Sequence, residues 1–175
     1  MAAIGASRAA AAAAAGLGLL LAAGCSSTRD NYACPQTAVV GELAELVHYR
    51  DGPGRDLTDV TLRARVLGIQ GECRYAKDGS VEVTTVVRIA ADRGPANQER
   101  KGHVDYFVAI LGPDADILAK EVFPVDMAFR EGVERITLVE ELAQRIPLAD
   151  PGLGMRHRVL VGFQFDREGL DRALR

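Results

Sequence analysis

The stretch KDGSVEVTTVVRIAADR, residues 77–93, carries the clearest structural signal in the sequence. Its Asp-Gly pair is typical of tight hairpin turns in which both central residues take a positive φ. After the turn, alternate residues continue one face for eleven residues: Val81, Val83, Thr85, Val87, Ile89 and Ala91. This period of two predicts a long β-strand with one buried face.

The residues before the turn supply a matching strand. In DVTLRARVLGI, residues 59–69, Val60, Leu62, Ala64 and Val66 share one face, and threonine and arginine occupy the other. The simplest interpretation of the arginines is a solvated face. The two stretches together predict an antiparallel hairpin.

Further strands are expected on both sides of this hairpin. The segment 38–52 predicts a strand near Leu46–Tyr49, with a short helix as the alternative. VDYFVAIL (104–111) and DILAKEVFPV (116–125) flank a GPDA turn, and Pro124 limits the second arm to an edge or a bulge. VERITLV (133–139) and RHRVLVGFQFD (156–166) are the remaining candidates, and residues 106–109 are apolar on both faces, as in a central strand.

The fold class predicted from these strands is all-β. We expect a single immunoglobulin-like or fibronectin-III-like antiparallel β-sandwich of about seven strands, with a short C-terminal helix or tail near Leu170 and Leu174. A closed barrel of the lipocalin type is the alternative.

The first 24 residues differ from the rest in composition. They hold one charge, Arg8, followed by an alanine tract and a short leucine-rich run, which predicts a secretory signal peptide. The step from Leu21 to Cys25 resembles the lipobox of bacterial lipoproteins. That resemblance implies cleavage before Cys25, acylation of this cysteine and a stable membrane anchor. An ordinary signal peptide followed by a chance cysteine is the alternative.

The predicted organisation is a lipoprotein signal peptide at 1–24, a lipidated cysteine and tether at 25–36, and a sandwich domain at 37–175. Removing Arg8 leaves 20 basic against 24 acidic residues, a net charge of −4. One domain of this size has room for a substantial core. The mild acidity argues against a nucleic-acid partner, which requires a clustered basic face. Ser26 favours the outer over the inner membrane.

Two cysteines remain once Cys25 is assigned to lipid. An even pair in an oxidising compartment predicts a disulfide between Cys34 and Cys73. Two free buried thiols are the alternative. The sequence has no Cys-x-x-Cys motif, which gives redox catalysis little support.

The sequence offers few catalytic or metal-binding patterns. It has no Gly-x-Ser-x-Gly motif, and its three histidines are widely separated. Asp51, Asp56 and Asp59 lie near a glycine-rich turn, but their spacing does not match a calcium loop, and turn-stabilising bonds are the preferred interpretation. We therefore expect a non-enzymatic protein without metal or cofactor.

The phrase RGPA is the most unusual loop in the sequence. Arg93, Gly94 and Pro95 form a candidate partner-contact loop because glycine and proline fix a tight turn beside an arginine. The alternative is a rigid loop with a structural arginine.

Five phrases together resemble a family. The phrases are GRDLTDV (54–60), GECRY (71–75), RGPA (93–96), YFVA (106–109) and VGFQ (161–164). In this order they resemble a group of envelope lipoproteins from alphaproteobacteria. The resemblance implies an envelope location and a β-rich domain, and it implies no activity.

The function predicted from the sequence is that of a lipid-anchored module that binds a protein partner or organises the envelope. The alternative is a carrier that holds a lipid or another small apolar ligand in a barrel-like cavity.

Overall fold

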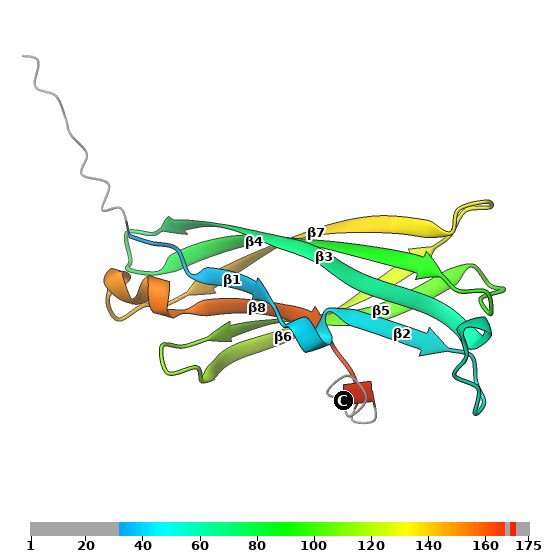
Figure 1. Cartoon of the computed structure of the whole chain (residues 1–175). Coiled ribbons are helices and arrows are strands. Elements are labelled where there is room, and N and C mark those ends of the chain that lie inside the picture. The colour runs from blue at the N-terminus through cyan, green and yellow to red at the C-terminus, as the bar shows by residue number, and fades with distance from the viewer. Residues whose placement is uncertain (1–31, 167–168, 171–175) are drawn as a thin grey trace, which may run out of the picture. The chain divides into compact units, whose positions relative to one another are not determined.

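The chain folds into two packed β-sheets of four strands each (Figure 1), in a computed structural model that describes residues 32–166 and 169–170. One sheet has the order β1-β8-β5-β6 and the other the order β2-β3-β4-β7. The strands are β1 (Gln36–Val39), β2 (Glu45–Tyr49), β3 (Val60–Tyr75), β4 (Val81–Arg93), β5 (Lys101–Leu111), β6 (Ile117–Ala128), β7 (Arg135–Ile146) and β8 (Arg158–Phe163). Three short 3-10 helices join them: η1 (Gly41–Leu43), η2 (Leu57–Asp59) and η3 (Pro151–Arg156). The predicted all-β sandwich is confirmed.

The hairpin predicted from residues 59–93 forms the centre of the second sheet. β3 and β4 pair in antiparallel register from Leu62 opposite Arg93 to Tyr75 opposite Val81. The expectation of two positive φ angles in its turn is wrong, because only Gly79 has one, at 85°. Gly79 N donates to the Ala76 carbonyl and Ala76 N donates to the Ser80 carbonyl. The connection is therefore a three-residue loop with glycine in the left-handed position.

A β-bulge interrupts β3 at Leu67. The pairing shifts between Val66 opposite Ile89 and Gly68 opposite Arg88, which leaves Leu67 without a partner residue on β4. Such an extra residue reverses the alternation of all side chains beyond it. Cys73 consequently packs against the core, although strict alternation from Val60 would place it on the outer face.

The segment before β3 forms two strands in different sheets. β1 pairs with β8 in parallel, and after η1 the chain crosses to the other sheet, where β2 pairs antiparallel with β3. The β2 strand confirms the prediction near Leu46–Tyr49. The β1–β8 pair is the exception to the predicted antiparallel arrangement, because these two strands run in the same direction.

The remaining strands follow an immunoglobulin-type order. β3-β4-β7 occupy the places of strands A, B and E, and β6-β5-β8 the places of C′, C and F. β1 lies where strand G would lie, and β2 extends the β3-β4-β7 sheet beyond the place of strand A. Strand G is the last strand of an immunoglobulin domain, whereas β1 is the first of the eight strands in the described residues. This place in the sheet is therefore filled from the N-terminal end of the chain.

One predicted boundary needs correction. β7 continues to Ile146, beyond the predicted segment 133–139. The sequence pattern does not show this extension because the inward-facing Glu140 and Gln144 break the apolar alternation. β6 is a sheet edge, as Pro124 predicts. Gly169 and Leu170 are helical, and Leu174 lies outside the described residues. Among the described residues no helix is long and apolar enough to cross a membrane.

Side chains from both sheets fill the space between them. Tyr106 and Phe163 of one sheet and Leu62 and Ile89 of the other are essentially inaccessible. Thr85 is buried on the predicted face of β4, where its hydroxyl donates to Gln144 Oε1 at 2.9 Å.

Candidate functional site

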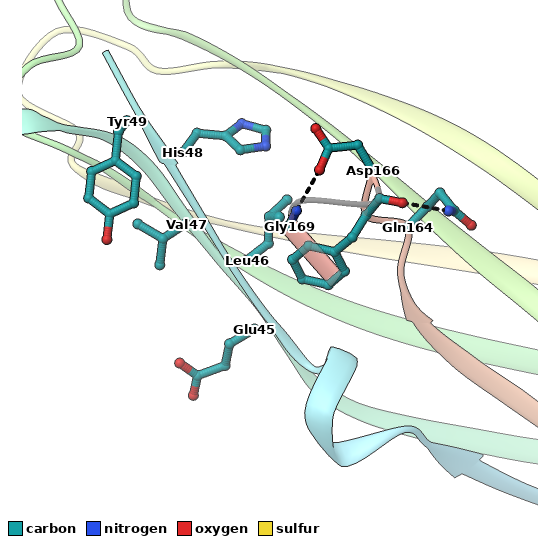
Figure 2. A pocket seen from close by; sticks show the side chains of 9 residues that line it. Glu45, Leu46, Val47, His48, Tyr49, Gln164, Asp166 and Gly169 are labelled. Carbon is teal, nitrogen blue, oxygen red and sulfur yellow. Dashed lines mark hydrogen bonds between the residues drawn. The ribbon is translucent and has the colours of Figure 1, made fainter. Parts of the chain in front are cut away.

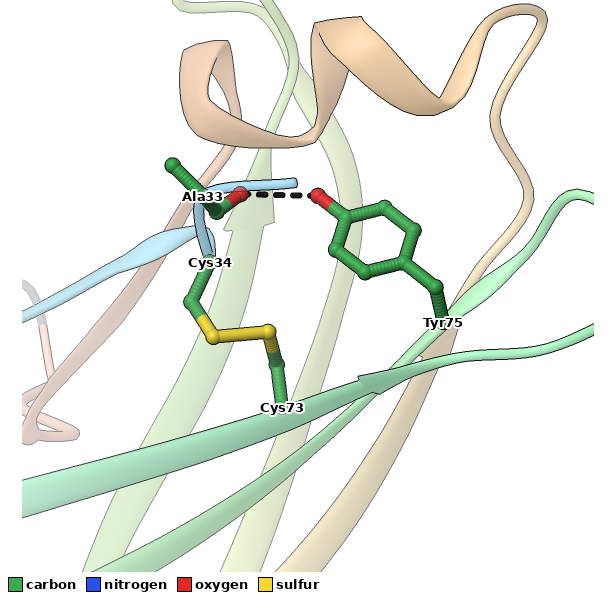
Figure 3. The surroundings of a disulfide bond; sticks show 4 residues. All are labelled: Ala33, Cys34, Cys73 and Tyr75. Atoms are coloured by element: carbon green, nitrogen blue, oxygen red, sulfur yellow. Dashed lines mark hydrogen bonds between the residues drawn. A yellow bond between two sulfur atoms is a disulfide. The ribbon is translucent and has the colours of Figure 1, made fainter. Parts of the chain in front are cut away.

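The predicted disulfide joins Cys34 to Cys73, with the Cα atoms 5.7 Å apart (Figure 3). Beside it, the Tyr75 hydroxyl donates to the Ala33 carbonyl at 2.7 Å. The link therefore holds the chain just before β1 against the end of β3. The predicted signal peptide and the lipidation site Cys25 lie outside the described residues.

The RGPA loop makes its polar contacts within the domain. The Arg93 guanidinium donates to the Asn97 carbonyl at 2.6 Å and to Glu134 at 2.7 Å. Gly94 is buried, and a side chain there would overlap the Val60 carbonyl. Of the three residues in the candidate contact loop, Pro95 is the exposed one. These contacts support the alternative of a rigid loop with a structural arginine.

An apolar surface covers the outer side of the β1-β8-β5-β6 sheet. Phe107, Ala109 and Leu111 of β5 point away from the core, yet each is less than one-tenth exposed. Leu43 of η1 and Leu160 of β8 pack beside them. Gly162 makes this possible, since a Cβ at that position would lie 2.9 Å from the Leu43 Cβ and 3.1 Å from the Phe107 ring. Residues 106–109 are apolar on both faces, as the sequence predicts.

A groove of about 340 Å³ follows this surface. We call it the outer groove; its lining includes Leu43, Phe107, Ala109, Leu111, Ile117, Lys120, Leu160, Phe165 and Leu170. Lys120 is the cation within it. Its ammonium lies 4.5 Å from the centre of the Phe107 ring and donates to Gln164 Oε1 at 2.8 Å.

Exposed apolar residues extend the outer groove along β6. Ile117 is 65% exposed, Leu118 51% and Val122 43%. Apolar side chains that gather at one sheet edge, next to an apolar groove, are typical of an interaction surface. The sequence signal for this surface is the double-sided apolar pattern of 106–109 together with the ILAKEV segment of β6.

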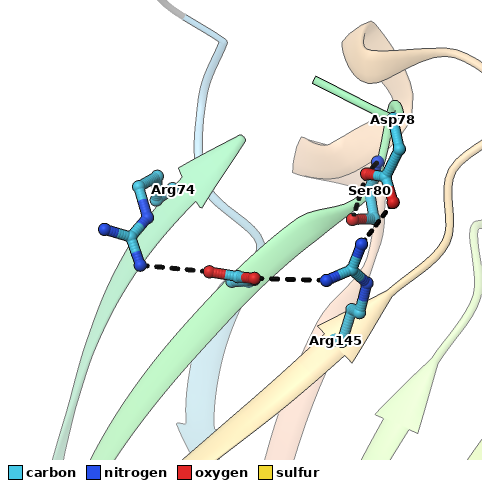
Figure 4. A network of polar contacts seen from close by, with 5 residues as sticks. Arg74, Asp78, Ser80 and Arg145 are labelled. Atoms are coloured by element: carbon cyan, nitrogen blue, oxygen red, sulfur yellow. Dashed lines mark hydrogen bonds and ion pairs between the residues drawn. The ribbon is translucent and has the colours of Figure 1, made fainter. Parts of the chain in front are cut away.

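The outer side of the other sheet is charged. Glu82 accepts from Arg74 at 3.1 Å and from Arg145 at 3.3 Å, and Arg145 also pairs with Asp78 (Figure 4). Ser80 donates to the Asp78 carboxylate from both its hydroxyl and its backbone N–H. The bonds from Ser80, followed by that from Arg145, lower the pKa of Asp78 to about 2. Arg63 and Arg65 of β3 are exposed on this outer side, as predicted.

A second depression, of about 350 Å³, lies between β2 and the segment after β8 (Figure 2). Its titratable residues are Glu45, His48, Tyr49 and Asp166, and the Asp166 carboxylate accepts from Gly169 N at 2.6 Å. Desolvation, with His103 as the next contributor, lowers the pKa of His48. None of the described lining residues is a serine, threonine or cysteine.

His103 forms a small polar cluster on the outer side of β5 and β6. Its Nδ1 lies 2.7 Å from Asp126 and its Nε2 lies 3.2 Å from Asp105. The bond to Asp126 is the main cause of a raised pKa of His103. Three-way groups of histidine, cysteine and carboxylate with metal-binding geometry do not occur in the described part of the chain.

The aspartates near the glycine-rich turn support the local structure. Asp59 is buried, and its carboxylate pairs with Arg50 at 2.5 Å and accepts from the Asp56 backbone N–H at 3.1 Å. The bond from the Asp56 backbone N–H is the turn contact between side chain and backbone that the sequence predicts.

The comparisons with known proteins add no relative to this picture. No protein-family model matches the sequence, and no curated protein matches it significantly.

Proposed function

We propose that this protein is a lipid-anchored lipoprotein of the bacterial envelope whose sandwich domain binds a protein partner. Cys25 is the proposed acylation site, and Ser26 favours the outer membrane. Envelope lipoproteins of alphaproteobacteria, which the five sequence phrases resemble, are the proposed family. The Cys34–Cys73 disulfide supports an oxidising compartment outside the cytoplasm.

The observation that carries the binding role is the outer groove with its exposed continuation on β6. A free outer sheet face is ordinarily polar, as on the opposite side of this molecule, whereas here it is apolar around Phe107. Binding of a partner would remove Ile117, Leu118 and Val122 from water. The filled space between the sheets favours this role over that of a carrier with an internal cavity. No catalytic role is proposed.

Two measurements test the proposal. For the anchor, mass spectrometry of the mature protein should give an acylated N-terminus at Cys25, and Cys25→Ser should release the protein from the membrane fraction. An unmodified thiol at Cys25 would contradict the proposed lipid anchor.

For the partner, the full-length protein is extracted from its native membranes in mild detergent and its complex is sized. Ile117→Asp should dissociate a complex that Arg88→Asp, an exposed change on the charged face, leaves intact. A protein that migrates alone in its native form, or a complex lost equally in both variants, would contradict the binding role.

A further inference from the structure

The β6 strand has a free edge. In the part of the chain that the structure describes, it is the last strand of its sheet, with β5 on one side and no strand on the other. Phe129 N donates to the Arg100 carbonyl, and this register continues along the β5–β6 pair. Because backbone groups alternate in direction, odd-numbered residues from Ala119 to Phe123 bond to β5. The N–H and C=O groups of Lys120 and Val122 therefore point to the free edge.

The usual protections of an edge strand border this segment without covering it. Pro124 removes one donor on the free side, and a register shift opposite Ile110 and Leu111 distorts the strand near Leu118. The lysine between them turns away from the edge, since Lys120 lies over Phe107 and bonds to Gln164. Residues 119–123 thus form an open five-residue pairing site.

A crevice of about 170 Å³ runs beside this site, between β6 and β7. Ile110, Phe123 and Leu142 give it apolar walls, and Glu121 and Gln144 also line it. A strand added to β6 would direct alternate side chains into this crevice and the others toward Val122 and the outer groove. On the outer side, rotation of the exposed Lys120 side chain away from Gln164 would bring its ammonium within reach of an acidic residue paired with it.

We propose that β6 accepts an extended segment of a partner protein as an additional strand along residues 119–123. The segment carries apolar residues at the positions that enter the crevice and a carboxylate opposite Lys120. This inference rests on the proposed binding function and specifies its mode, in which backbone bonds give affinity and the alternate side chains give specificity.

A second copy of this chain fits the edge less well. Twofold antiparallel pairing centred on Lys120 places two lysines opposite each other. Pairing centred on Glu121 places two glutamates opposite each other. Pairing centred on Val122 places each Lys120 opposite Pro124, which has no backbone N–H to donate. Like charges directly opposite each other destabilise a strand pair. Charge complementarity therefore favours a different chain with an acidic residue.

The test uses a matched pair of variants. Val122→Pro removes a donor that faces the free edge, as the native Pro124 does, and leaves the bonds to β5 in place. Val122→Thr is the control, since it keeps both the donor and the strand. A displayed library of twelve-residue peptides is selected on the full-length protein and counter-selected on Val122→Pro.

Selection should enrich peptides that alternate apolar residues and carry an acid, with at least tenfold weaker binding to Val122→Pro than to Val122→Thr. In the unmodified protein, a bound peptide should slow exchange of the Lys120 and Val122 amides and leave that of Glu121 unchanged. The exchange measurement holds even if Val122→Pro folds poorly.

Three results would overturn the proposal: no enriched peptide, equal binding to the two variants, or a dimer that Val122→Pro abolishes. Peptides that bind both variants but lose affinity with Ile117→Asp would overturn the strand addition alone. In that case the outer groove remains the binding site and the proposed function stands.

Discussion

The β3–β4 and β5–β6 hairpins have the same turn but opposite outer faces. In each, a three-residue loop ends in a left-handed residue, Gly79 in the first and Ala115 in the second. The first hairpin is linked to β1 through Cys73, and its outer face is covered by ion pairs. The second places Phe107 on its outer face and ends at a free edge. On this difference rests our proposal that the first hairpin stabilises the domain and the second forms the binding surface.

The largest effect is expected from removal of the disulfide. Cys34→Ser with Cys73→Ser frees a closed loop of about 40 residues, which should lower the free energy of unfolding by about 4 kcal/mol. Urea denaturation under non-reducing conditions measures it. A loss below about 1 kcal/mol would show that the first hairpin does not depend on this link.

The next effect separates the two outer faces. Phe107→Ala should lower the free energy of unfolding by about 3 kcal/mol, because the ring is buried although it lies outside the core. Arg65→Ala on the charged face removes an exposed pair with Glu45 and should cost less than about 1 kcal/mol. Equal losses in denaturation experiments would contradict the distinction between the faces.

The two turns should respond in opposite directions to a methyl group. Gly79→Ala forces alanine to the left-handed conformation and should lower the free energy of unfolding by about 1 kcal/mol. Ala115→Gly relieves the same strain, where φ is 65°, and should raise it by about 0.5–1 kcal/mol. Thermal unfolding of both variants measures the signs, and a matching sign in the two would mean that the turns are not equivalent.

The smallest effects concern pH, again with opposite signs. The lowered pKa of Asp78 stabilises the first hairpin above the ordinary aspartate pKa, and this stabilisation is lost as pH falls from about 4 to about 2. The raised pKa of His103 stabilises the second hairpin below its ordinary pKa of 6.5, and this is lost as pH rises through the raised value.

NMR titration of the histidines tests the second half of this prediction. His103 should titrate above 6.5 and His48 below it, and Asp126→Asn should lower the pKa of His103. For the first half, Asp78→Asn should flatten the acid dependence of unfolding. A His103 pKa that does not respond to Asp126→Asn would exclude the assigned cause.

The sequence predicts where the strands lie better than it predicts how they pair with one another. Alternation locates β3, β4, β5 and β8, and the cysteine count predicts the disulfide. It cannot place Leu67 in a bulge, because one unpaired residue leaves both flanking patterns intact. Nor can it separate β1 from β2, since contacts between distant segments decide which sheet each joins.

The same limit applies to the candidate site. The double-sided apolar pattern at 106–109 predicts a central strand, and Pro124 predicts an edge. Their adjacency depends on the pairing of β5 with β6. The RGPA loop attracts attention in the sequence because of its composition, but the two terminal nitrogens of Arg93 bind Asn97 and Glu134 within the domain.

Photo-cross-linking tests the central claim most directly. A photoreactive amino acid is placed at position 122 on the β6 edge, or at position 88 on the charged face, in the full-length protein in its native membranes. We predict a cross-linked adduct of one defined mass from position 122 and none from position 88. An adduct from position 88 alone, or no adduct from either, would contradict the assignment of the β5–β6 hairpin as the binding surface.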